Sequence, residues 1–127
     1  MHRIIVTLNE EVFKDLGEKN REELAHLWQE AIKQDFVGLH PESSIPIRWI
    51  IRSDYHDGGD ISLEVYFPVS SVQSPTSGHD ELIDKLIDVS VPVVSQVVYS
   101  SIGIDVLVIP ELNSRSKSRE VGSDVDP

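Results

Sequence analysis

The 127-residue chain has no cysteine and only one methionine. Without cysteine it can form no disulfide, thiolate metal site or cysteine nucleophile, and this composition fits a reducing compartment, so we expect a cytoplasmic protein. No apolar run approaches the roughly 20 residues that a membrane-spanning helix needs. The apolar run Ile4–Val6, which follows Met1, His2 and Arg3, is too short for a signal peptide. The sequence therefore predicts a soluble protein with no membrane partner.

Basic residues are scarce: 11 Lys and Arg stand against 22 Asp and Glu, for a net charge of −11. Basic and acidic residues balance in the last fifteen positions, so residues 1–112 carry the entire net negative charge. A phosphate backbone is bound by cations that displace its counterions, so we expect no nucleic-acid partner. A basic protein partner would be attracted, although acidity also serves solubility.

The length and the 39% hydrophobic content predict one α+β domain at residues 1–112, large enough to bury a core. Residues 113–127 alternate serines with basic residues and then turn acidic. They offer too little apolar surface to offset the entropy of ordering, and this predicts a flexible polar tail.

Residues 45–69 have the alternating pattern of an amphipathic β-hairpin, with strands at 45–52 and 61–69. Because side chains alternate between the faces of a strand, Arg48, Arg52 and Glu64 would point away from the buried face. In the register of a three-residue loop, Arg52 would stand opposite Glu64. A cross-strand ion pair is therefore the structural alternative to a ligand site at these arginines.

Two more strands are predicted at residues 3–8 and 104–109, because both are apolar on nearly every position, as strands in the middle of a sheet are. Asn9 predicts a short helical turn that Gly17 interrupts. Asn20 and Glu23 form a plausible capping pair for the long helix that follows, which Gly38 can close.

A second helix is predicted from about Asp80, after a surface loop at residues 70–78. Pro92 leaves residues 91–99 open between a kinked helix, which we favour, and a strand. The order strand, helix, strand, strand, helix, strand predicts a two-layer sandwich: a four-stranded sheet with two helices on one face. The ferredoxin-like fold and the tautomerase superfamily both have this order.

Four segments carry a resemblance to a known family: Met1–Val6, Ile47–Ile50, Ser62–Phe67 and Ile104–Leu112. They resemble the 5-carboxymethyl-2-hydroxymuconate isomerase branch of the tautomerase superfamily, over residues 1–112. The resemblance implies two strand-helix-strand halves in each subunit, a trimer, and proton transfer next to a carbonyl. It also implies a strand arginine that grips a carboxylate, a place that Arg48 or Arg52 could occupy.

The proton carrier of that family is an amino-terminal proline, and this chain begins instead with Met1 and His2. We therefore expect the binding half of the site without its acid-base half. His2, Tyr55 and His56 are weaker site candidates, and His56 lies among carboxylates that could tune a proton carrier. The histidines do not fall at ligand spacing, so we expect no metal. The sequence has no Gly-rich phosphate loop or other cofactor motif, so we expect no cofactor.

Two functional hypotheses follow. The first is a small acidic tautomerase-like protein, weak or inactive as an isomerase, that binds a small carboxylate or keto acid. We expect it to be a homo-oligomer, a trimer with edge strands paired between subunits. The alternative is a non-catalytic acidic protein-protein interaction module of the inhibitor, immunity or phage-assembly type, for which we expect a monomer.

Overall fold

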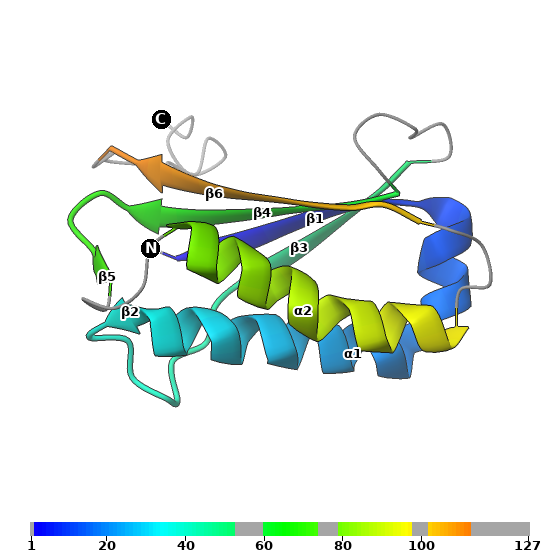
Figure 1. The fold of residues 1–127 in the computed structure, drawn as a ribbon, viewed down its shortest axis with the longest axis horizontal. Coiled ribbons are helices and arrows are strands. Elements are labelled where there is room, and N and C mark those ends of the chain that lie inside the picture. Colours follow the sequence, from blue (N-terminus) through cyan, green and yellow to red (C-terminus); the bar gives the residue numbers. More distant parts are fainter. Residues whose placement is uncertain (1, 53–59, 74–78, 98–101, 113–127) are drawn as a thin grey trace, which may run out of the picture.

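The computed structural model describes residues 2–52, 60–73, 79–97 and 102–112 (Figure 1). The elements are β1 (Arg3–Asn9), α1 (Glu10–Asp35), β2 (Phe36–Val37), β3 (Ile47–Arg52), β4 (Ile61–Pro68), β5 (Val72–Gln73), α2 (His79–Val97) and β6 (Ile104–Glu111). The predicted order of four main strands and two helices is confirmed. The short strands β2 and β5 form a separate antiparallel pair, so part of the predicted loop at residues 70–78 is a strand.

The main sheet has the strand order β3-β1-β4-β6. The strands β1 and β3 are parallel, β4 and β6 are parallel, and β1 and β4 meet antiparallel in the middle. Each helix thus joins two adjacent parallel strands, and the domain consists of two strand-helix-strand halves. In a ferredoxin-like sheet another strand splits each such unit. The ferredoxin-like alternative therefore does not describe this sheet.

The predicted hairpin at residues 45–69 is wrong, because β1 lies between β3 and β4. Arg52 stands opposite Asn9 on β1, and Glu64 stands opposite Ile5, so the predicted Arg52-Glu64 pair does not form. Alternation along a strand fixes which face is buried but not which strand lies beside it. The missing neighbour is β1, which precedes α1 in the sequence and is apolar enough to be paired on both sides.

The expectation of a central strand is confirmed for β1 and wrong for β6. Within the described part of the chain, β6 pairs with β4 alone and forms one edge of the sheet, while β3 forms the other. Because β6 is an edge strand, it continues through Pro110 to Glu111, and proline is tolerated in such a position. Leu107 is 54% exposed on it, so the apolar run at residues 104–109 reflects only partial burial.

Helix α1 begins where the sequence predicts, with the Asn9 side chain accepting a hydrogen bond from the Glu11 backbone at 2.8 Å. Gly17 interrupts it with φ 73° and ψ 166°, a conformation that is essentially restricted to glycine. The predicted capping pair at Asn20 does not form. The Asn20 amide donates to the Leu16 carbonyl at 2.7 Å instead, bracing the kink from within the helix.

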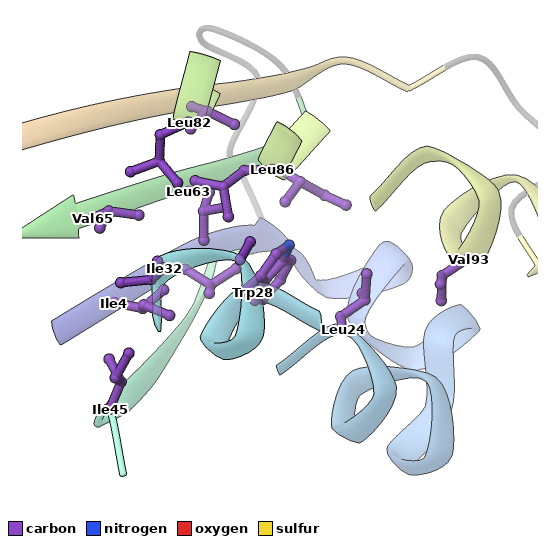
Figure 2. Close-up of a cluster of buried hydrophobic side chains, with 14 of the residues drawn as sticks. Ile4, Leu24, Trp28, Ile32, Ile45, Leu63, Val65, Leu82, Leu86 and Val93 are labelled. Carbon is purple, nitrogen blue, oxygen red and sulfur yellow. The ribbon is translucent and has the colours of Figure 1, made fainter. Parts of the chain in front are cut away.

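Both helices cover one face of the sheet (Figure 1). The core between the layers (Figure 2) is formed by buried side chains of the strands and helices, including Ile4, Val6, Leu63, Val65, Leu24, Trp28, Ile32, Leu82 and Leu86. Within it, the Trp28 indole donates to the Ser90 hydroxyl at 2.7 Å, and this hydroxyl donates to the Leu86 carbonyl at 2.6 Å. Ser90 lies on α2, which stays helical through Pro92 to Val97.

Candidate functional site

Arg48 and Arg52 lie on β3 with their side chains on the face of the sheet that the helices leave uncovered, here called the open face. Both are exposed. In the register of β3 with β1, Arg48 stands opposite Ile5 and Arg52 opposite Asn9. Within the described part of the chain neither arginine forms an ion pair or a side-chain hydrogen bond. The two guanidinium groups are therefore available to an external anion.

The weaker candidates are not gathered around these arginines. Tyr55 and His56 lie outside the described residues. His2 precedes β1, and its ring contacts the edge of the Phe36 ring at 4.6 Å between centroids. This places His2 on the helix side of the sheet, whereas Arg48 lies on the open face. A proton carrier at His2 and a carboxylate held by Arg48 would thus be on opposite sides of β1.

The His2 imidazole is unusual in its burial. Its Nε2 atom is buried and has no hydrogen-bond partner among the described residues. Burial, followed by repulsion from the positive amino terminus, lowers the pKa of His2 below its usual value of 6.5, because both disfavour the charged ring. At neutral pH His2 is therefore a neutral imidazole packed against an aromatic ring.

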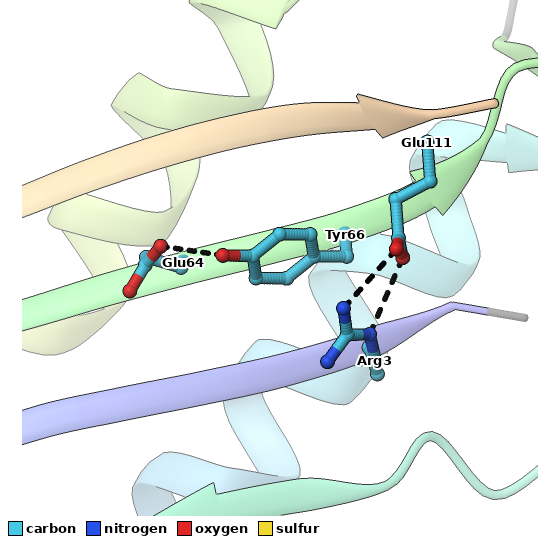
Figure 3. Close-up of polar contacts among 4 residues, drawn as sticks. All are labelled: Arg3, Glu64, Tyr66 and Glu111. Carbon is cyan, nitrogen blue, oxygen red and sulfur yellow. Dashed lines mark hydrogen bonds and ion pairs between the residues drawn. The ribbon is translucent and has the colours of Figure 1, made fainter. Parts of the chain in front are cut away.

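Sequence reasoning missed a polar cluster on the open face, composed of Arg3, Glu64, Tyr66 and Glu111 (Figure 3). Arg3 donates from Nε and Nη2 to the two Glu111 carboxylate oxygens at 3.2 and 3.1 Å. The central carbon of the Arg3 guanidinium group lies 4.2 Å from the centroid of the Tyr66 ring. Tyr66 donates its hydroxyl proton to Glu64 at 2.6 Å. The cluster joins β1 and β6 across the intervening strand β4.

The protonation states in this cluster follow from its contacts. Hydrogen bonds from Arg3 lower the pKa of Glu111, and the same pair raises the pKa of Arg3. The hydrogen bond to Glu64, followed by burial, raises the pKa of Tyr66. At neutral pH Glu111 is ionised and Tyr66 keeps its proton. Arg3 therefore already holds a carboxylate from its own chain, in contrast to Arg48 and Arg52.

No local signal marks the Arg3-Glu111 pair, since 108 positions separate the two residues and their strands are not neighbours. The period-two alternation of residues 3–9 does place Arg3 on the same face as Ile5 and Thr7. The strand order places one strand, β4, between β1 and β6, and this brings the carboxylate of Glu111 within reach of the Arg3 side chain.

Among the described residues no group of three or more His, Asp or Glu side chains could hold a metal ion. No helix in the described ranges has the length and apolar character to span a membrane. No protein-family model matches the sequence, and no curated protein matches it. The function is therefore argued from the geometry of the open face.

Proposed function

We propose that the protein is a small acidic tautomerase-like protein that binds a small carboxylate or keto acid through Arg48 or Arg52. The observation that carries this proposal is the state of the three open-face arginines. Arg3 is occupied by Glu111, while Arg48 and Arg52 are exposed and have no side-chain partner among the described residues. A guanidinium fork matches the geometry of a carboxylate. The two strand-helix-strand halves are what the resemblance to tautomerases implies.

We expect the protein to be weak or inactive as an isomerase. Enol-keto conversion needs an acid-base group within hydrogen-bond reach of the carbon that gains or loses the proton. On the open face Arg48 has Ile5 opposite and Ile50 two positions along β3, and neither side chain can carry a proton. The neutral imidazole of His2 lies on the helix side. A bound keto acid would thus be held without a proton carrier beside it.

Binding can be tested by the thermal shift that succinate or phenylpyruvate causes in the original chain and in the variants Arg48→Ala and Arg52→Ala. A ligand of the folded state raises its stability by mass action, so the shift should be lost in at least one variant. Lys19→Ala is the matched control, because it removes the same charge from an exposed position of α1. Equal shifts in all four proteins would contradict the proposal.

Turnover is measured separately, as enol-keto conversion of phenylpyruvate by the original chain. We expect a rate no higher than that of a control protein of similar charge. Robust turnover would contradict the inactive-isomerase part of the proposal while leaving carboxylate binding in place.

The proposal includes a homo-oligomer, a trimer, in which subunits pair through the edges of their sheets. Among the strands of the described ranges, β3 and β6 each pair on one side, and unpaired edges readily accept another strand. A light-scattering mass at tens of micromolar protein tests it. A mass of one chain would contradict the trimer.

An interaction module for a basic protein is the second candidate. The exposed side of α2 carries four carboxylates, from Asp80, Glu81, Asp84 and Asp88, and such a surface attracts a basic partner and speeds its association. This candidate is favoured if the chain is monomeric and none of the tested carboxylates shifts its stability.

A further inference from the structure

The two edges of the sheet carry opposite charges on the open face. Strand β3 presents Arg48 and Arg52, and strand β6 presents Asp105 near its beginning. All three side chains are exposed. In the described part of the chain none of them has an ion pair or a side-chain hydrogen bond. Each edge thus offers a charge that the opposite edge of a second copy could neutralise.

Each edge also exposes a large apolar side chain. Ile51 on β3 is 45% exposed and Leu107 on β6 is 54% exposed. Alternation places Leu107 on the open face and Ile51 on the helix side. An edge that combines unpaired backbone groups with exposed apolar side chains is prone to pair with another strand.

Proline limits where such pairing can occur. Pro46 immediately precedes β3, and Pro110 lies near the end of β6. Both prolines lie toward the end of the sheet where β1 begins, because Ile47 is level with Ile4 and Pro110 with Phe67. Proline has no N–H to donate to a neighbouring strand. The edges are therefore blunted at one end and free of proline over 47–52 and 104–109.

From these features we infer that copies of this chain pair head to tail, with the β3 edge of one copy against the β6 edge of the next. The inference rests on the proposed homo-oligomer and names the surfaces that form it. Strands β3 and β6 run in opposite directions within the sheet, as the pairings with β1 and β4 show. A continuous sheet therefore joins them as an antiparallel ladder, with the open faces of both copies on the same side.

One register satisfies both the charges and the apolar side chains. It places Arg52 of one copy opposite Asp105 of the next, and Ile50 opposite Leu107. On the helix side the same register places Ile51 opposite Val106. Directly opposed side chains lie about 5 Å apart and interact, whether apolar or oppositely charged. The exposed Leu107 and Ile51 are then covered, and Pro110 falls at the margin of the ladder.

Pairing of like edges lacks this match. Two β3 edges would bring arginines against arginines, and two β6 edges would leave Asp105 without a cation. Like charges directly opposite each other destabilise a strand pair. Because head-to-tail contacts use two different surfaces, they generate a ring when the rotation closes, as the proposed trimer requires. Arg52 is then occupied by Asp105, and Arg48 is the arginine left for a ligand carboxylate.

A charge exchange tests the contact. The variants are Arg52→Asp, Asp105→Arg and the double variant, which keeps the net charge of −11. Their masses are measured by light scattering over a protein dilution series at one salt concentration. We expect each single variant to dissociate at least about tenfold more readily than the original chain, since like charges then meet. The double variant should recover most of this loss because the pair is restored with its signs reversed.

Two controls make the same charge changes elsewhere: Lys19→Asp on α1 and Asp84→Arg on α2, both at exposed positions. They should leave the assembly unchanged. Circular dichroism establishes that each variant is folded, and Arg52→Gln with Asp105→Asn replaces any variant that is not, each then expected to weaken assembly.

The outcomes separate this inference from the proposal on which it rests. An oligomer that neither single variant weakens, or that the double variant does not restore, would overturn the β3-β6 contact and leave the oligomer itself standing. A monomeric original chain would overturn both. In that case the prolines and edge charges serve to keep the sheet from pairing.

Discussion

The hydrogen bond between Trp28 and Ser90 ties α1 to α2 inside the core, and replacing Ser90 by alanine tests what it contributes. Both side chains are 1% exposed, so no water replaces the lost hydroxyl. In Ser90→Ala the Trp28 indole N–H keeps its place but loses its acceptor. The Leu86 carbonyl also loses the hydroxyl, but it can still accept a backbone hydrogen bond within the helix.

The expected loss follows from these contacts. A buried donor left without a partner costs about 1–3 kcal/mol. Alanine forms helix more readily than serine, which returns about 0.5 kcal/mol. We therefore expect Ser90→Ala to lower the free energy of unfolding by about 0.5–2.5 kcal/mol, which corresponds to roughly 2–10 °C in Tm.

Urea unfolding of the original chain and of Ser90→Ala, at one fixed protein concentration, measures this difference. Ser95→Ala is the matched control, because Ser95 is exposed on the same helix and its hydroxyl donates to the Pro92 carbonyl at 3.3 Å. The control should change stability by less than about 0.5 kcal/mol. If Ser90→Ala were as stable as Ser95→Ala, the indole would not depend on this hydroxyl and the reasoning would be refuted.

Two further predictions concern pH and the kink of α1. The pKa of His2 in the folded chain lies below its usual value of 6.5, so between these two values the unfolded chain binds the proton more strongly and stability falls as pH falls. His2→Phe should remove this part of the pH dependence. Urea unfolding of both proteins at neutral pH and at about pH 5 measures it, and an equal loss of stability at pH 5 in the original chain and in His2→Phe would contradict the prediction. Gly17→Ala places a side chain in a backbone conformation that is essentially restricted to glycine, and we expect a loss of about 1–3 kcal/mol in urea unfolding, whereas an unchanged midpoint would show that the kink relaxes freely.

The sequence predicted the faces of the strands better than their neighbours. The alternation in β4 correctly identifies Ile61, Leu63 and Val65 as buried, because alternation is a property of one strand. The choice of partner depends on the whole sheet. The hairpin prediction failed there, since the adjacency of β3 and β4 in sequence was taken as adjacency in space, and β1 was left out of account.

The polar cluster escaped prediction for the same reason. Arg3 and Glu111 stand at opposite ends of the described chain, and neither belongs to a motif. Their contact depends on two strand pairings, β1 with β4 and β4 with β6, and both must be known before the two side chains can be placed beside each other. Arg48 and Arg52 were accessible to sequence reasoning because one strand contains both. Their exposure is confirmed, and their role stays a prediction.

The ion pair between Arg3 and Glu111 shows that the start of β1 and the end of β6 lie at the same end of the sheet. The Arg3 Nη2 and Glu111 Oε2 atoms are 3.1 Å apart. A pulling force applied through the two ends of the domain would therefore open that end first. Such a force acts perpendicular to the strands β1, β4 and β6. The hydrogen bonds between these strands would therefore break one after another and would not resist the force together. We therefore expect a domain that is mechanically weak when it is stretched by these two ends.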